Sequence, residues 1–170
     1  MTLAALDAAD AATAAAAFER CCGAAAWVRA MLAARPFAGV AALHAAADAC
    51  AATLAESDWL EAFSHHPRIG DVSALRAKFA TTATWAGGEQ SGTAAADDAT
   101  LHALARGNDA YFEKFGFIFI VCATGLTAAE MLARLEARLP NDRATELRNA
   151  AAEQLKITHL RLDKLLSEDV

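Results

Sequence analysis

The chain has 170 residues, a mass of 17.8 kDa and a formal net charge of −6 at pH 7. This length suits one domain, so we predict a single domain over residues 1–170. The acidic balance argues against nucleic acid or an anionic membrane surface as the main partner. A composition that is 56% hydrophobic and has only three prolines excludes collagen-like, disulfide-scaffold and disordered proteins.

Alanine dominates the composition, with 48 of the 170 residues. Alanine loses no side-chain entropy in a helix, so this abundance favours helical structure. We predict an all-α fold, a compact domain of about seven to nine helices.

Cysteine usage and hydropathy point to a cytoplasmic protein. The four cysteines contain no C-x-x-C pair, so free thiols in a reducing compartment are expected. No lysine or arginine precedes Arg20, so no secretory signal is evident. The longest strongly apolar run, residues 115–123, is too short to span a bilayer, and no membrane association is expected.

Apolar spacing and breaker residues predict three helices in the first third of the chain. The first begins at the alanine-rich stretch after Asp10 and ends near Gly23. The second carries residues 27–32 and stops before Pro36, because the residue before a proline avoids the α region. The third runs from about Gly39 to Ala55.

Two further short helices are expected before the middle of the chain. Ser57 is a good N-cap for a helix that Pro67 must end. Asp71 or Ser73 can cap the next, which runs through Phe79. The polar, glycine-bearing residues 81–93 that follow predict a loop or a broken helix.

Three helices are predicted in the second half. The first has apolar residues spaced three and four apart over residues 101–115 and closes at Gly116. Thr127 and Glu130 form a capping box for a helix that runs to about Leu139. The last helix runs from residue 141 to about residue 166 with Arg161 on its flank. Its predicted apolar face consists of Leu147, Ala151, Leu155, Thr158, Leu162 and Leu165.

The aromatic and β-branched residues 117–122 do not fit this helical pattern. By propensity they would form a strand, but the chain has no second run of this kind to pair with. The segment is therefore either the start of a buried helix or an extended stretch whose backbone amides cradle a ligand.

Three features could carry chemistry. His66 lies in the His-Pro-Arg-Ile-Gly turn, and histidine exchanges protons near neutral pH. Glu89 and Gln90 offer hydrogen bonds to a small polar ligand from a glycine-bearing loop, and Arg161 can bind a carboxylate. Each also has an ordinary structural explanation. No metal or nucleotide motif is present, so the residues alone predict a helical domain with a possible acid–base site.

Four segments of the chain form an ordered set of motifs. They are His66-Pro67-Arg68-Ile69-Gly70, Trp85-x-x-x-Glu89-Gln90, Asn108-x-x-Tyr111-x-x-Lys114-Phe115-Gly116-Phe117-Ile118-Phe119-Ile120-Val121-Cys122 and Glu153-Gln154-x-Lys156-Ile157-x-x-Leu160-Arg161-Leu162. Taken together and in order, these motifs closely resemble the family of 2-oxo-4-hydroxy-4-carboxy-5-ureidoimidazoline (OHCU) decarboxylases. The resemblance covers nearly the whole chain and is strongest from His65 onward.

The resemblance implies a cofactor-free carboxy-lyase of urate degradation that forms (S)-allantoin from an anionic ureidoimidazoline. It further implies an all-α homodimer that needs neither metal nor organic cofactor. By residue match His66 would be the general acid, Glu89 its partner at the substrate and Arg161 an anion-binding group. The implied substrate-binding residues are Pro67, Gln90, Phe117, Ile118, Phe119, Ile120 and Val121.

Two other functions stay open at this point. One is another cofactor-free lyase or hydrolase that acts on a ureido or hydantoin-like ring. The other is a helical interaction domain without catalysis, in which the three candidate residues would not gather at one site.

Overall fold

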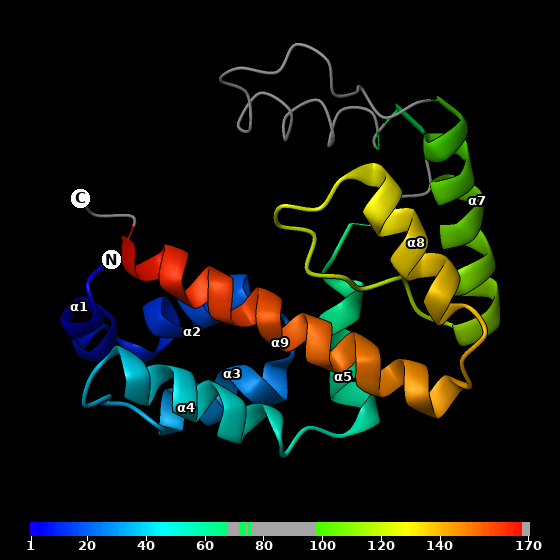
Figure 1. Cartoon of the computed structure of the whole chain (residues 1–170). Coiled ribbons are helices and arrows are strands. Elements are labelled where there is room, and N and C mark those ends of the chain that lie inside the picture. Colours follow the sequence, from blue (N-terminus) through cyan, green and yellow to red (C-terminus); the bar gives the residue numbers. More distant parts are fainter. Residues whose placement is uncertain (68–71, 74, 76–97, 168–170) are drawn as a thin grey trace, which may run out of the picture. The chain divides into compact units, whose positions relative to one another are not determined.

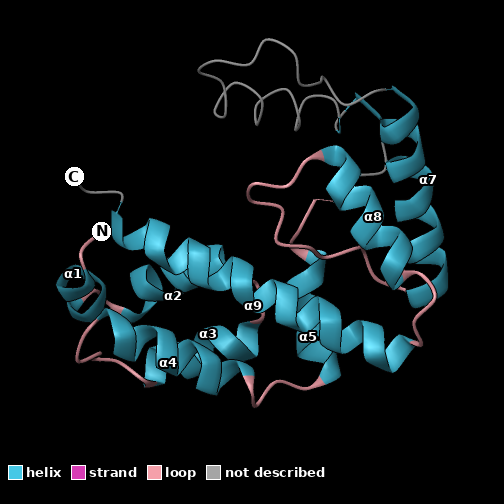
Figure 2. Ribbon diagram, in the orientation of Figure 1, coloured by secondary structure: helices cyan, strands magenta, loops and turns pink. Residues whose placement is uncertain are grey.

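The protein is described by a computed structural model over residues 1–67, 72–73, 75 and 98–167. These residues form eight helices and no strand, which confirms the predicted all-α fold (Figures 1 and 2). The chain divides into two compact units, one made of residues 1–66 and 149–170 and the other of residues 67–148. A single domain over residues 1–170 stays a prediction.

The first unit contains five short helices and most of the last one. They are α1 (Leu3–Ala8), α2 (Ala11–Cys21), α3 (Ala25–Ala33), α4 (Val40–Ala51), α5 (Glu56–Ser64) and the part of α9 (Arg143–Ser167) from Asn149 onward. Helix α3 packs against α2, α4 and α5 (Figure 1).

Aromatic packing around α3 forms much of the first unit's core. Trp27 is almost fully buried, and its indole nitrogen donates a hydrogen bond of 3.1 Å to the carbonyl oxygen of Ala47 on α4. The ring of Phe18 on α2 meets Trp27 edge-on, with centroids 6.0 Å apart. A buried indole that keeps a hydrogen-bond partner contributes its large apolar area without a desolvation cost for its N–H.

In this unit one helix was missed and two predicted helix boundaries were wrong. Helix α1 was not predicted at all. Helix α4 ends at Ala51 rather than Ala55, because the hydroxyl of Thr53 bonds the carbonyl of Cys50 at 2.8 Å and favours a turn. Ser57 is not the N-cap of α5: the cap is Ala55, whose amide donates to the Asp58 carboxylate at 2.8 Å.

The second unit is built on α7 (Asp98–Phe115) and α8 (Ala128–Arg138), which lie side by side (Figure 1). Gly116 ends α7 with a φ of +77°, and Thr127 with Glu130 forms the capping box of α8, so both predicted boundaries are confirmed. The core residues of this unit are Leu75, Leu101, Leu104, Ala105, Ala128 and Met131. Of the predicted helix through Phe79, residues 72, 73 and 75 are helical and the rest lies outside the described residues.

Helix α9 buries a different face from the one its apolar residues predict. The fully buried positions are Glu146, Ala150, Gln154, Thr158, Leu162 and Leu165. The predicted face is confirmed for Thr158, Leu162 and Leu165. In the first half of the helix the predicted positions are wrong by one residue, because Leu147, Ala151 and Leu155 are only half-buried. Three polar side chains, Glu146, Gln154 and Thr158, occupy the buried stripe, and each has a hydrogen-bond partner. Among the described residues, no helix is long and apolar enough to cross a membrane.

Candidate functional site

The imidazole of His66 is held by a buried amide on α9. His66 follows α5 directly, and its side chain is half-buried. Its Nε2 lies 2.6 Å from Oε1 of Gln154, a side chain with no exposed area. Because one partner is fully buried and the contact is short, the orientation of the imidazole ring is well defined.

Arg161 comes to the same region because it shares a helix face with Gln154. Residues 154, 158 and 161 are spaced four and three apart, which places them on one side of α9. The guanidinium Nη1 of Arg161 donates to the carbonyl oxygens of Arg20 at 3.3 Å and Cys21 at 3.5 Å, at the end of α2. These contacts orient the guanidinium while leaving its other N–H groups for a ligand.

The surroundings of His66 favour its neutral form. Burial lowers the pKa of His66 below its ordinary value of 6.5, and the positive charge of Arg161 lowers it further. The hydrogen bond with Gln154 acts in the opposite direction but does not outweigh burial. Two of the three predicted catalytic residues, His66 and Arg161, are therefore close enough to interact electrostatically.

A surface pocket of about 480 Å³ opens beside Arg161. Its lining consists of Glu19, Arg20, Cys21, His65, Arg161, Lys164 and Leu165. The lining includes three basic side chains and one carboxylate, so the pocket is positive although the chain as a whole is acidic. Such local charge attracts small anions in spite of a repelling net charge.

Several other predicted site residues cannot be placed together with His66 and Arg161. Glu89 and Gln90 lie outside the described residues, as does Arg68 of the same turn motif. Pro67 is exposed and belongs to the second unit. Their roles stay predictions.

The predicted ligand-binding segment 117–121 is neither helix nor strand, so the alternative of a helix start was wrong. Phe117 and Ile120 are buried, while Ile118, Phe119 and Val121 are half-buried. Arg138 on α8 donates from Nη1 to the Ile120 carbonyl oxygen at 2.7 Å, and its guanidinium lies 4.7 Å from the Phe119 ring centroid. The segment is thus fixed by a cation, and its role as an amide cradle stays a prediction.

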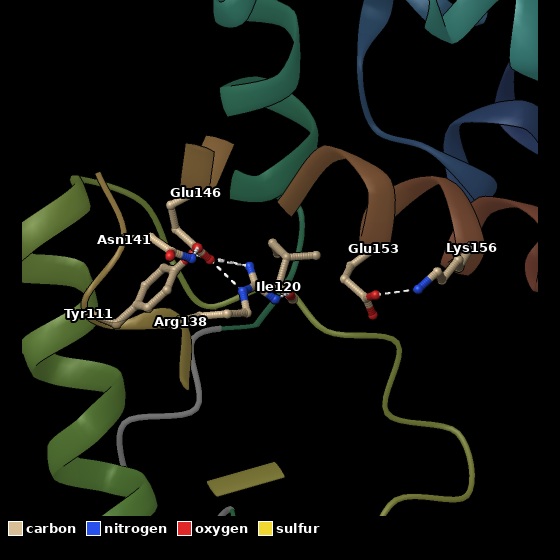
Figure 3. Close-up of polar contacts among 7 residues, drawn as sticks. All are labelled: Tyr111, Ile120, Arg138, Asn141, Glu146, Glu153 and Lys156. Carbon is tan, nitrogen blue, oxygen red and sulfur yellow. Dashed lines mark hydrogen bonds and ion pairs between the residues drawn. The ribbon is translucent and has the colours of Figure 1, made fainter. Parts of the chain in front are cut away.

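Arg138 also belongs to a buried polar network next to this segment (Figure 3). Glu146 has no exposed side-chain area, and its carboxylate accepts hydrogen bonds from Arg138, from the Tyr111 hydroxyl at 2.5 Å and from the Asn141 amide at 2.9 Å. Burial alone would raise the pKa of Glu146, but these hydrogen bonds together lower it. Burial and the bond to Glu146 raise the pKa of Tyr111 far above its ordinary value.

Sequence reasoning did not single out these buried polar residues as a network. Gln154 and Thr158 could have been found from their four-residue spacing on the helix that carries Arg161. Arg138 and Glu146 had no such signal, because charged residues on helices usually face solvent. Among the described residues, no three His, Cys, Asp or Glu side chains are grouped so as to hold a metal ion.

Comparison with known proteins gives a consistent result. A family model described as OHCU decarboxylase matches residues 7–163. The chain is 42% identical over 151 residues to "Uric acid degradation bifunctional protein TTL" of Arabidopsis thaliana, covering 87% of this chain and 46% of that protein. It is 38% identical over 77 residues to 2-oxo-4-hydroxy-4-carboxy-5-ureidoimidazoline decarboxylase of Amia calva, covering 45% of this chain and 44% of that protein. The matches thus span about half the length of these relatives.

A solved structure agrees with these sequence matches. The crystal structure of an OHCU decarboxylase in the presence of (S)-allantoin superposes with a TM-score of 0.72 at 38% identity, covering 89% of this chain and 97% of that one. The family match extends over both His66 and Arg161. The chain therefore belongs to the OHCU decarboxylase family.

Proposed function

We propose that this protein decarboxylates OHCU and protonates the product on one face to give (S)-allantoin. The proposal is carried by one observation in the first unit: the charge of Arg161 acts on His66. The imidazole of His66 is held by the buried amide of Gln154 and is neutral at pH 7. A proton-exchanging group beside an anion-binding group is what an anionic substrate that must lose CO2 and gain a proton requires. Membership of the family supports this substrate class.

The substrate itself supplies the electron sink. Its carboxylate and hydroxyl are on a carbon next to a C=N bond. When the bond to the carboxylate breaks, CO2 leaves, the electron pair forms a C=C bond to the imine carbon, and the π pair of the C=N bond moves onto the ring nitrogen. The hydroxyl then loses its proton to form a ketone, while the ring nitrogen and the former imine carbon each gain one, so the reaction takes up one proton overall. No electron-accepting cofactor is needed for these steps, and we propose that the protein uses none.

The protein's part is orientation and proton placement. Arg161 binds the carboxylate or ureido end of the substrate, and exclusion of water from that carboxylate favours departure of neutral CO2. Because its lowered pKa makes His66 neutral at pH 7, it delivers a proton only after accepting one. The substrate hydroxyl is a source of that proton, and Glu89 is proposed as the partner of His66 there.

Two broader features are also proposals: the dimer comes from the resemblance, and the compartment from the cysteine usage. We propose that the protein is a homodimer and that it works in the cytoplasm. Sedimentation of the purified protein at several concentrations tests the dimer. Localisation of a tagged protein in its own cells tests the compartment.

Circular dichroism of the product tests the proposed reaction. Purified protein is mixed with freshly generated OHCU, with no added metal, and the optical activity of the allantoin is followed. A fast signal of one sign supports the proposal. A slow course that gives racemic allantoin, as in the protein-free control, contradicts it. Parallel assays on other ureido and hydantoin-like rings then test the alternative of a different lyase or hydrolase.

A matched pair of histidine variants tests the role of His66. His66→Asn should abolish stereospecific turnover, because asparagine cannot exchange a proton at neutral pH. His102→Asn, which changes an exposed histidine on α7, should keep wild-type activity. A near-normal rate in His66→Asn would remove His66 from the mechanism.

A further inference from the structure

The side chains of His66, Gln154 and Thr158 form a chain of hydrogen bonds inside the first unit. His66 Nε2 lies 2.6 Å from Gln154 Oε1, and Gln154 Nε2 lies 3.4 Å from Thr158 Oγ1. The threonine hydroxyl also lies 3.0 Å from the backbone carbonyl oxygen of Gln154 and 3.5 Å from that of Cys21. Gln154 has no exposed side-chain area and Thr158 is 1% exposed, so water does not compete for these bonds.

The direction of each bond follows from the backbone end of the chain. A carbonyl oxygen can only accept, so the single hydroxyl proton of Thr158 points to a backbone carbonyl. The hydroxyl oxygen is then left as an acceptor, and it accepts a hydrogen bond from the amide nitrogen of Gln154. This fixes the amide so that its oxygen faces His66.

The last bond of the chain determines where the proton of His66 lies. An amide oxygen has no proton to give, so the bond forms only if Nε2 of His66 carries the proton. In a neutral imidazole the other nitrogen, Nδ1, then holds the lone pair. Turning the amide around would bring its oxygen against the hydroxyl oxygen of Thr158, whose proton is already engaged with a backbone carbonyl. Two acceptors would then be in contact at that buried end, with no water to relieve them.

We propose that Gln154 and Thr158 are positioning residues that hold His66 in the tautomer with the proton on Nε2, so that Nδ1 is the atom that exchanges protons with the substrate. This inference rests on the proposed function for its catalytic meaning, but the tautomer itself is a property of the protein without substrate. The tautomer and the proposed function can therefore be contradicted by separate experiments.

Long-range ¹H–¹⁵N NMR of the ¹⁵N-labelled protein at pH 7 tests the tautomer directly. A protonated ring nitrogen and one with a lone pair resonate far apart, and the signals of His66 are those lost in His66→Asn. We expect the proton on Nε2 in the wild type. A dominant Nδ1-protonated ring would overturn the proposal whatever the activity of the enzyme.

Thr158→Val and Thr158→Ser form the matched pair. Valine keeps the shape but removes the hydroxyl that directs the amide, so His66 should become a mixture of both tautomers. The kcat should fall by about tenfold or more with little change in KM, because a ring in the wrong tautomer is unproductive. Serine restores the hydroxyl and should restore both the tautomer and kcat. An unchanged tautomer in a folded Thr158→Val protein would contradict the proposal.

Gln154→Glu provides a second test if the valine variant does not fold. A carboxylate can only accept from Nε2 and adds negative charge, so it should retain the Nε2 proton and raise the pH at which His66 gains its second proton. A titration of His66 unchanged from the wild type would mean that residue 154 does not govern this imidazole. If the wild-type protein shows no stereospecific activity, by contrast, only the proposed function is contradicted, and the proposed tautomer is not.

Discussion

The guanidinium of Arg138 and the carboxylate of Glu146 form a buried ion pair in the second unit (Figure 3). The side chain of Arg138 is 14% exposed and that of Glu146 is not exposed at all. Arg138 also donates to the Ile120 carbonyl oxygen at 2.7 Å. In a planar peptide the C=O and the next N–H point in opposite directions, so this bond also sets the direction of the Val121 amide. The ion pair thus fixes the backbone of the predicted ligand-binding segment.

Removing the cation of this pair should be strongly destabilising. In Arg138→Met the apolar stem is kept, but Glu146 is left as a buried charge without its main partner. We expect the free energy of unfolding, measured in urea, to fall by about 3–5 kcal/mol. Arg134→Ala, which removes an exposed arginine of the same helix, should change it by less than about 0.5 kcal/mol. Equal losses in the two variants would show that the pair does not stabilise the fold.

Tyr111 is the only tyrosine of the chain, so its ionisation can be followed without interference from another tyrosine. Burial and the hydrogen bond to Glu146 raise its pKa well above the ordinary 10.0. Because the folded state favours the neutral phenol, the contribution of Tyr111 to stability is fully present below pH 10.0 and is lost as pH rises above it, through the raised pKa of the folded state. Absorbance titration should therefore show no tyrosinate near pH 10 in the folded protein. Tyrosinate should form there in urea-unfolded protein. An ordinary titration in the folded protein would contradict the buried hydrogen bond.

Local signals predicted well those elements that local interactions define. The capping box of Thr127 and Glu130 and the positive φ of Gly116 are satisfied by residues within one turn, so the ends of α7 and α8 were correctly predicted. Ser57 failed as a cap because Asp58, one residue later, bonds the Ala55 amide instead. Two adjacent polar residues compete for one helix start, and composition alone does not decide between them.

The candidate site shows a second limit of sequence reasoning. His66 and Arg161 were proposed from motif order, and both lie in the first unit, where the charge of Arg161 acts on His66. The buried stripe of α9 was misplaced because apolar periodicity assigns Glu146 and Gln154 to solvent. Their burial depends in part on partners that are far away in the sequence: His66, 88 residues before Gln154, and Tyr111, 35 residues before Glu146. Long-range polar pairs of this kind leave no period in a single sequence.

Gly23 should not tolerate a side chain. A Cβ built on it would lie 2.6 Å from Nδ1 and 2.7 Å from Cβ of His65, the residue next to His66. Gly23→Ala must therefore displace His65, and we expect a loss of about 1–3 kcal/mol in stability together with a lower kcat. Gly39→Ala is the matched control, because a Cβ there meets nothing within 4 Å. If both variants behave alike, the close approach to His65 is without consequence.

The charge of Arg161 should set the pH at which His66 becomes protonated. Burial and then this charge hold the pKa of His66 below 6.5, because the folded protein disfavours the imidazolium form. In Arg161→Met one of these causes is gone, so the pKa should rise, whereas Arg161→Lys keeps the positive charge and should move it less. NMR titration of His66 in the wild type and the two variants measures the order of the three pKa values directly.

The same pair of variants links this titration to catalysis. If His66 must be neutral to accept a proton, kcat/KM of the wild type should fall only below pH 6.5, as His66 becomes protonated. In Arg161→Met this acidic limb should move to higher pH, with a raised KM and a lowered kcat, because the proposed anion-binding group is also lost. Arg161→Lys should keep the limb near its wild-type position even if its activity is reduced. An acidic limb that does not follow the NMR titration of His66 would show that another group takes the proton.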